Sequence, residues 1–284
     1  MPVLSNLKRI VWGCRRTMGW IVLIMATLTG CVHEIKTPVN TKLDLTQAAL
    51  TRNRIGMECL QMGDIERAQM ELEHARQLDP DLAETYNGLG LVYSQEGDLK
   101  RAEANFRRAL KLDVNNGQAQ TDYGAFLFHQ GKLPEACEHF SQASQNVLYA
   151  NRAIAFENLG LCYAQRGMIE PAEAAFIRAL KMNDHLAVST LELSEIFFDQ
   201  KEYARAQSGY EGYLRLMGDK PLSARALWLG WRLALWHGNR QAQIDLALKL
   251  RVLYPDSPEY REYRKVMGMA PVAASPASET PTRH

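Results

Sequence analysis

The chain is 284 residues long, contains 46% apolar and 23% charged residues, and has a formal net charge of +1. These values are those of ordinary globular proteins, so they exclude a fully disordered chain, a collagen and a polytopic membrane protein. The near-neutral charge gives no basic field that would indicate nucleic acid binding, and five cysteines are too few and too scattered for a disulfide-framework domain.

The first predicted element is a lipoprotein signal peptide over residues 1–30. It contains four basic residues and no acidic one, followed by an apolar run of 11 residues. That run is far shorter than the roughly 20 residues of a membrane-spanning helix, and the layout is that of an export signal. It ends in Leu28-Thr29-Gly30-Cys31, which resembles the bacterial lipobox and implies cleavage before Cys31 and acylation of that cysteine with palmitate. A plain secreted protein and a short uncleaved anchor remain as alternatives.

The residue after the predicted acylation site is Val32 rather than aspartate. In enterobacterial-type sorting an aspartate at this position retains a lipoprotein in the inner membrane, so Val32 favours the outer membrane, facing the periplasm. Cleavage removes four basic residues and leaves 29 Lys and Arg against 32 Asp and Glu, a net charge of −3. Residues 31–48 are then expected to form a lipidated tether.

Residues 49–258 repeat one motif six times. Glycines recur every 34 residues at Gly56, Gly90 and Gly124, and the series continues with Gly160, Ser194 and Gly230. In the second repeat the frame consists of Tyr86, Leu89, Gly90, Tyr93, Gly97, Ala102, Phe106 and Ala109. This frame resembles the tetratricopeptide repeat (TPR). The resemblance implies an all-α, right-handed superhelical solenoid of about six helix-turn-helix repeats, of which the last two are degenerate.

The frame has a physical reason. Leu89, Gly90 and Tyr93 share one face of a predicted first helix. Gly90 costs roughly 1 kcal/mol of helix propensity, so close packing of two helices must compensate for it. Phe106 lies between two alanines of the second helix and is expected to fill the space between hairpins. Since one hairpin cannot bury its own apolar face, stability comes from stacking on its neighbours.

Three features depart from the regular frame. Gln145–Arg152 adds two residues between the third and fourth repeats. The turn of the sixth repeat, at Gly238, is predicted to be one residue longer than the others. Residues 259–284 are predicted to be a C-terminal extension, disordered from about Met269, because this tail is rich in Ala, Pro, Ser and Thr and has no periodicity.

Catalytic motifs are missing from the sequence. It contains no G-x-S-x-G, H-E-x-x-H or G-x-x-x-x-G-K-[ST]. The partial glycine motif Gly88-Leu89-Gly90 lies within a predicted helix, and the histidines never have a metal-ligand spacing. We therefore predict a protein that is not an enzyme, with no catalytic residue, cofactor, metal, small-molecule substrate or nucleic acid partner.

Three cysteines besides Cys31 remain after cleavage, in the oxidising periplasm. Cys137 falls early in the second helix of repeat three, and Cys162 falls late in the first helix of repeat four, which should stack on it. We predict a Cys137–Cys162 disulfide; the alternative is two small buried side chains.

The first helices of a TPR stack line a groove, and the frame places nine candidate partner-binding residues there. They mix apolar and neutral polar groups: Asn87, Leu91, Gln95, Phe128, His129, Leu161, Gln165, Phe198 and Trp231. Phe128 and Phe198 are the predicted aromatic anchors, with ordinary inter-helix packing as the alternative. The lysine- and asparagine-rich clamp of chaperone-binding TPRs does not line up here.

A lipobox followed by about six TPRs resembles the PilF/PilW family of type IV pilus biogenesis lipoproteins. The resemblance covers residues 31–258 and includes Arg54-Ile55-Gly56 and Tyr86-Asn87-Gly88-Leu89-Gly90. It implies a pilotin, which helps to carry the outer-membrane secretin to its membrane and supports its assembly into a ring, so secretin subunits are the expected partners. The alternative function is a periplasmic lipoprotein adaptor for peptidoglycan or other cell-envelope enzymes.

Overall fold

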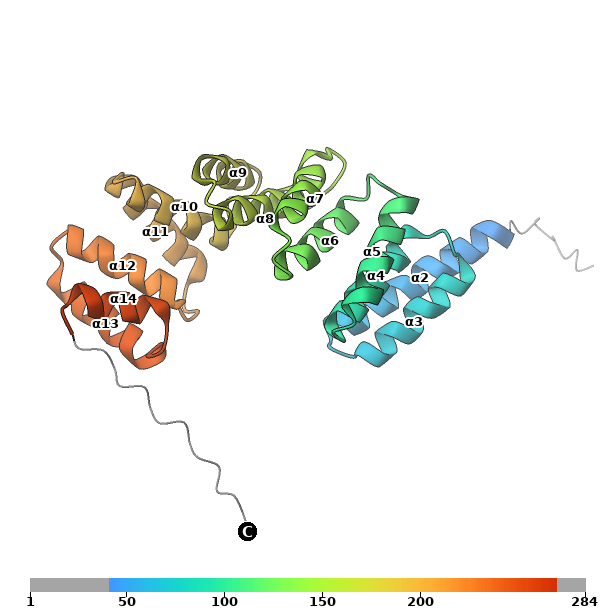
Figure 1. Cartoon of the computed structure of the whole chain (residues 1–284), viewed down its shortest axis with the longest axis horizontal. Helices are drawn as coiled ribbons and strands as arrows, with labels where there is room; N and C mark the ends of the chain where they lie inside the picture. Colours follow the sequence, from blue (N-terminus) through green and yellow to red (C-terminus); the bar gives the residue numbers. More distant parts are fainter. Residues whose placement is uncertain (1–40, 270–284) are drawn as a thin grey trace, which may run out of the picture. The chain divides into compact units, whose positions relative to one another are not determined.

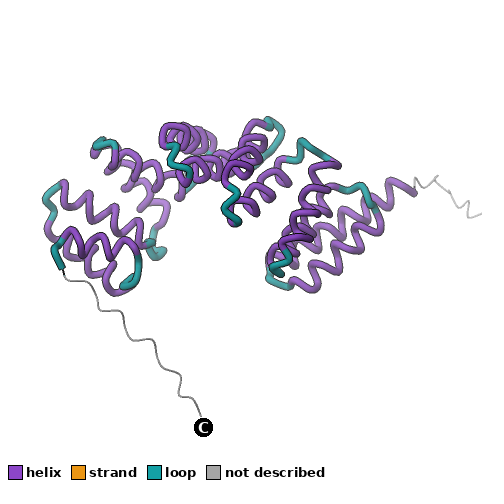
Figure 2. The backbone as a smooth tube through the Cα atoms, viewed as in Figure 1, coloured by secondary structure: helices purple, strands orange, loops and turns teal. Residues whose placement is uncertain are grey.

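The computed structural model describes residues 41–269, and every regular element within them is an α-helix (Figure 1, Figure 2). Of these helices, none has both the length and the apolar character needed to cross a membrane. The predicted signal peptide, the acylation site Cys31 and most of the predicted tail lie outside the described residues.

Twelve of the described helices form six hairpins, each with a first and a second helix (Figure 1). The hairpins are α2 (Thr41–Gln61) with α3 (Ile65–Leu78), α4 (Ala83–Gln95) with α5 (Leu99–Leu112), α6 (Gly117–His129) with α7 (Leu133–Gln145), α8 (Arg152–Gln165) with α9 (Ile169–Met182), α10 (Ala187–Asp199) with α11 (Tyr203–Met217), and α12 (Ala224–Trp236) with α13 (Arg240–Leu253). A single helix follows, α14 (Pro258–Val266). The predicted all-α TPR fold is confirmed.

Large and small residues alternate in the core of the hairpins. A Cβ atom on Gly90 would lie 2.8 Å from Cδ1 of Phe106, which is fully buried. The next two hairpins repeat the arrangement, at Gly124 with Phe140 and at Gly160 with Phe176. The close packing predicted at the repeat glycines is confirmed, and the phenylalanine ring occupies the space that their missing side chains leave.

All six hairpin turns are three residues long, and the middle residue has a positive φ. Five of the turns have glycine there, the residue that adopts this backbone region without strain, whereas the fifth turn has Lys201 with φ 66°. The prediction of a longer sixth turn was wrong. The repeat frame shifts by one residue inside α12. Trp231, and not Gly230, lies as far before the turn glycine Gly238 as Gly90 of α4 lies before Gly97. Gly230 instead faces the preceding hairpin, because its Cβ would lie 2.3 Å from Oη of Tyr210.

The helical array extends beyond its predicted N-terminal limit. α2 begins at Thr41, so residues 41–48, which were predicted to belong to the tether, are helical. Thr46 donates a hydrogen bond from Oγ1 to Oδ2 of Asp79 at 2.7 Å, and Ala49 is fully buried. These contacts fix the second half of the segment, which the repeat frame did not reveal because none of its marker residues lies there.

The array also extends beyond its predicted C-terminal limit of residue 258, since residues 259–266 of the predicted extension belong to α14. Ser257 caps this helix through its side chain, and Pro258 occupies the first turn, where a missing N–H costs little. Tyr260 and Tyr263, three residues apart, are both buried. α14 contacts both α12 and α13, so it packs onto the last hairpin as an additional helix.

Candidate protein-binding face

The first helices of neighbouring hairpins contact one another, α4 with α6, α6 with α8 and α8 with α10. The accessible residues predicted for partner binding lie on these helices. We call them the first-helix face: Leu91, Gln95, Phe128, His129, Leu161, Gln165 and Phe198. Gln95, His129 and Gln165 are exposed, and the four apolar residues are half-buried.

The apolar residues of the face also take part in packing. Leu91 and Phe128 lie against the buried cluster that contains Phe106, and the Phe128 ring lies 6.5 Å from that of Phe140. Leu161 and Phe198 pack in the same way against buried residues of their own hairpins and of the hairpins that follow. Each side chain therefore has one side fixed by the core and one side open to a partner.

Asn87 is buried, 5% exposed, and ties two first helices together. Its Nδ2 donates a hydrogen bond to Oδ2 of Asp122 at 2.7 Å, and Oδ1 of the same carboxyl accepts one from Gln118 at 2.9 Å. Burial raises the pKa of Asp122, although these two hydrogen bonds oppose the shift. Asn87 therefore holds α4 against α6, and its burial keeps the side chain away from a partner.

Trp231 is also buried, 3% exposed, and its predicted contact with a partner does not agree with this position. Its ring stacks on Trp228 at 5.2 Å and meets the edge of Tyr263 of α14 at 5.2 Å. The short helix α14, which lies outside the predicted repeats, covers this ring. Among the tryptophans of residues 41–269, the exposed one is Trp236, with 46% of its surface accessible.

A cation–π arrangement that the repeat pattern does not predict joins α10 and α12. The guanidinium carbon of Arg232 lies 4.5 Å from the ring centroid of Phe198 and 5.5 Å from that of Trp228. Arg232 Nη1 also donates a hydrogen bond to Oδ1 of Asp199 at 3.2 Å. Arginine so placed fixes the orientation of both rings, and one of those rings belongs to the first-helix face.

A second arginine of α12 joins the same two helices. Arg225 donates hydrogen bonds to both carboxylate oxygens of Glu192, one of them at 3.0 Å, and a further one to Glu195. Burial raises the pKa of Glu195, and the charge of Arg225 opposes the shift. Glu192 and Arg225 are 33 residues apart, as are Asp199 and Arg232. A search for opposite charges about one repeat apart would have found both pairs.

Two cysteines face each other between the third and fourth hairpins. Sγ of Cys137 in α7 and Sγ of Cys162 in α8 are 2.17 Å apart, with the Cα atoms 5.6 Å apart. Cys59 of α2 is a buried free thiol. In the part of the chain that the structure describes, no group of three or more His, Cys, Asp or Glu side chains could hold a metal ion.

Comparison with known proteins identifies the family. The family model of the tetratricopeptide repeat matches residues 46–113 and 117–184. The type IV pilus assembly protein PilF of Pseudomonas aeruginosa strain PAO1 is 33% identical over 247 residues, which cover 86% of this chain and 96% of that protein.

Two solved structures are similar as well. The structure of Pseudomonas aeruginosa PilF superimposes with a TM-score of 0.75 and 31% identity, covering 78% of this chain and 99% of the solved PilF chain. The structure of PilW, described as a widely conserved type IV pilus biogenesis factor, superimposes with a TM-score of 0.64 and 25% identity. The match covers 76% of this chain and 98% of the solved PilW chain. The similarity thus spans nearly the whole of each relative. The chain belongs to the PilF/PilW family of type IV pilus assembly proteins, which are built from tetratricopeptide repeats.

Proposed function

We propose that the protein is a pilotin, an outer-membrane lipoprotein that binds subunits of the type IV pilus secretin and supports their localisation and assembly. The observation that carries the proposal is the 33% identity with the pilus assembly protein PilF across 96% of its length. A scaffold of TPR hairpins suits this role, because stacked hairpins create an extended surface on which another polypeptide can bind.

The first-helix face is the proposed binding surface for the secretin. Leu91, Phe128, Leu161 and Phe198 are half-buried apolar residues on four successive first helices. A strand or helix of the secretin can bury its apolar side chains against them, and aromatic anchors in such interfaces carry most of the affinity. The exposed amides Gln95 and Gln165 can accept and donate hydrogen bonds beside them.

Attachment through Cys31 is the second part of the proposal. Acyl chains contribute about 0.8 kcal/mol per buried CH2, and several chains together make attachment permanent. Labelling of growing cells with radioactive palmitate should mark the wild-type protein and leave Cys31→Ala unmarked. The Cys31→Ala protein should also leave the outer-membrane fraction, and unchanged labelling of that variant would exclude this site.

Deletion of the gene tests the function. Without the protein, the secretin should remain monomeric or stay in the inner membrane, and pili should be lost. Complementation with Phe128→Ala or Phe198→Ala should restore secretin multimers only weakly, whereas Met62→Ala, an exposed residue outside the first-helix face, should restore them fully. Normal secretin multimers in the deletion strain would refute the proposal. An envelope-growth defect with intact pili would favour the adaptor for peptidoglycan enzymes.

A further inference from the structure

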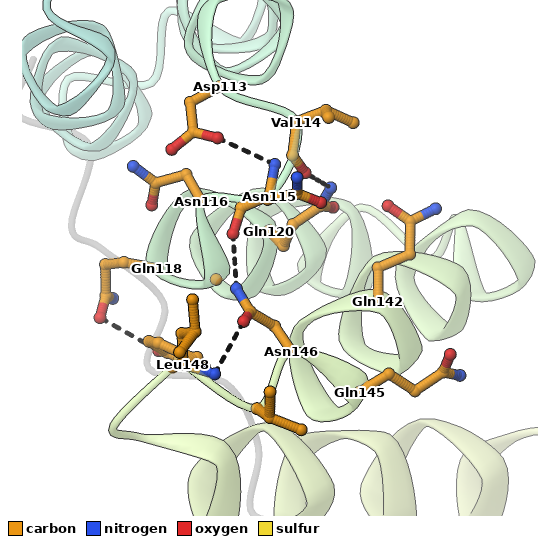
Figure 3. Close-up of a pocket in the computed structure, with 13 residues that line it drawn as sticks. Asp113, Val114, Asn115, Asn116, Gln118, Gln120, Gln142, Gln145, Asn146 and Leu148 are labelled. Atoms are coloured by element: carbon orange, nitrogen blue, oxygen red, sulfur yellow. Dashed lines mark hydrogen bonds between the residues drawn. The ribbon is translucent and has the colours of Figure 1, made fainter.

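The two residues inserted between the third and fourth hairpins help to form a pocket of about 900 Å³ (Figure 3). Its lining comes from the α5–α6 connection, the start of α6, the end of α7 and the α7–α8 connection. None of the residues of the first-helix face contributes to it. The volume falls within the roughly 300–1,000 Å³ of typical ligand sites.

The wall of this pocket is held in place by hydrogen bonds between the two connections. Asn146 donates from Nδ2 to the backbone oxygen of Asn115 at 2.6 Å, and its Oδ1 accepts from the backbone N–H of Leu148 at 3.0 Å (Figure 3). Tyr149 donates from its hydroxyl to Oε1 of Gln118 at 3.1 Å. A Cβ on Gly117 would lie 2.4 Å from Cγ of Tyr149, so only glycine admits this ring. A pocket fixed in this way needs little reorganisation to bind a ligand.

The lining is rich in amides and nearly free of charge. Asp113 is the one charged residue among the lining residues, and its Oδ1 accepts a hydrogen bond from the backbone N–H of Asn115 at 3.0 Å. The amide residues are Asn115, Asn116, Gln118, Gln120, Gln142, Gln145 and Asn146. Gln118, Gln120 and Asn146 already use both ends of their amides within the chain. The side chain of Asn115, Nδ2 of Asn116 and the Oε1 atoms of Gln142 and Gln145 remain, and they match the N–H and C=O groups of an extended peptide backbone. Apart from Asp113, such a lining offers no ionised group that would compensate for removing a charged side chain from water.

Three aliphatic side chains that line the same pocket are exposed to solvent. Val114 is 63% exposed, Val147 75% and Leu148 91%. The hydrogen bonds of Asn146 fix the turn that carries two of them. An apolar surface held in water beside neutral amides is suited to an aliphatic side chain of a bound segment.

We propose that this pocket binds an extended, uncharged polypeptide segment. The backbone of the segment hydrogen-bonds to the amides, and an aliphatic side chain of the segment packs against Val114, Val147 and Leu148. The proposal is independent of the secretin assignment, because it concerns a different surface and follows only from the chemistry of this pocket.

A random dodecapeptide phage library, selected on the full chain in detergent and depleted on the Leu148→Glu variant, tests the proposal. Enriched peptides should lack charged residues and contain an aliphatic one. Fluorescence anisotropy of the best peptide should show binding at least about tenfold weaker for Leu148→Glu and for the double variant Gln142→Ala/Gln145→Ala. These side chains are exposed, so equal thermal melting of all variants is expected to verify that the fold is retained.

Met62→Glu is the matched control, since Met62 is 73% exposed in the first hairpin turn, and it should bind like the wild type. Failure to enrich peptides that depend on Leu148, or enrichment of charged peptides, would overturn the proposal. Binding of chitotetraose that Leu148→Glu abolishes, with no peptide binding, would also overturn it and assign the pocket to a glycan.

Discussion

The carboxylate of Glu157 in α8 accepts two hydrogen bonds from Ser189 in the first turn of α10, one from the backbone N–H at 2.9 Å and one from the hydroxyl at 2.8 Å. α10 begins after Leu186, whose side chain provides no cap. The preceding hairpin therefore supplies the acceptor that an N-cap side chain usually supplies. Its negative charge is also favourable at the positive end of the helix dipole.

Replacing Glu157 by alanine should lower the free energy of unfolding by about 1–2 kcal/mol, because the buried donors of Ser189 lose a charged acceptor. Urea denaturation followed by circular dichroism measures the change. Glu58→Ala is the control, since Glu58 is exposed and its side chain has no hydrogen bond or ion pair within residues 41–269. Equal stability of the two variants would show that the contact does not hold the hairpins together.

Replacing Gly90 by valine should destabilise the protein by about 1–3 kcal/mol, since the added carbon atoms meet the buried ring of Phe106. Thermal unfolding measures the loss. In the double variant Gly90→Val/Phe106→Leu the smaller side chain makes room, so the two substitutions should cost less together than the sum of the single variants. Strict additivity would mean that the two residues do not compete for the same space.

The hairpins could be predicted because their packing recurs along the sequence. Gly90 and Phe106 meet within one hairpin, and the same pair of positions returns in the next two hairpins. Phe128 and Phe198 lie half-buried on first helices, where the same frame places them. The burial of Trp231 could not be predicted in this way, because it depends on Tyr263 of a short helix outside the repeat.

The candidate site was predicted less completely for a similar reason. Asn87 has the position of a groove residue, yet its side chain is buried and donates a hydrogen bond to Asp122 of the next first helix. Arg232 was overlooked because the TPR frame describes apolar and small residues and contains no charged marker. Contacts between side chains of neighbouring repeats are therefore the part of the site that a repeat frame does not encode.

A covalent bond between Cys137 and Cys162 should stabilise the protein by about 3 kcal/mol, because it closes a loop of 25 residues in the unfolded chain. Non-reducing peptide mapping should recover the two cysteines in one linked peptide pair. The variant Cys137→Ser/Cys162→Ser should unfold at lower denaturant concentration. Cys59→Ser alters a cysteine outside the pair and controls for the loss of a thiol. Two unlinked peptides from protein purified without reductant would contradict the prediction.

Acidification should weaken the third hairpin through His139. Nδ1 of His139 lies 2.6 Å from Oε1 of Gln120, and the ring is 4.6 Å from that of Tyr123. Burial lowers the pKa of His139 below its ordinary 6.5, although the charges of Glu138 and Glu135 oppose the shift. The unfolded chain therefore binds this proton more readily than the folded one. The stability that the neutral ring contributes is complete above pH 6.5 and is lost as the pH falls through the lower folded pKa.

Thermal unfolding at pH 7 and pH 5 measures this effect. The melting temperature of the wild type should fall more between the two values than that of His139→Gln, whose side chain does not titrate. His185→Gln is the control, because His185 is an exposed histidine in the α9–α10 connection. The same loss of melting temperature in His139→Gln and the wild type would assign the acid sensitivity to other groups.

α14 has a consequence for the number of hairpins that can stack. It contacts α12 and α13 together, the place where the first helix of another hairpin would add. Its tyrosines cover Trp231 and Leu250, which would otherwise form an exposed apolar surface at the end of the array. A chain terminated before Ser257 should therefore dimerise through this uncovered end at high concentration, which sedimentation velocity would detect, whereas the intact chain should remain monomeric at this end.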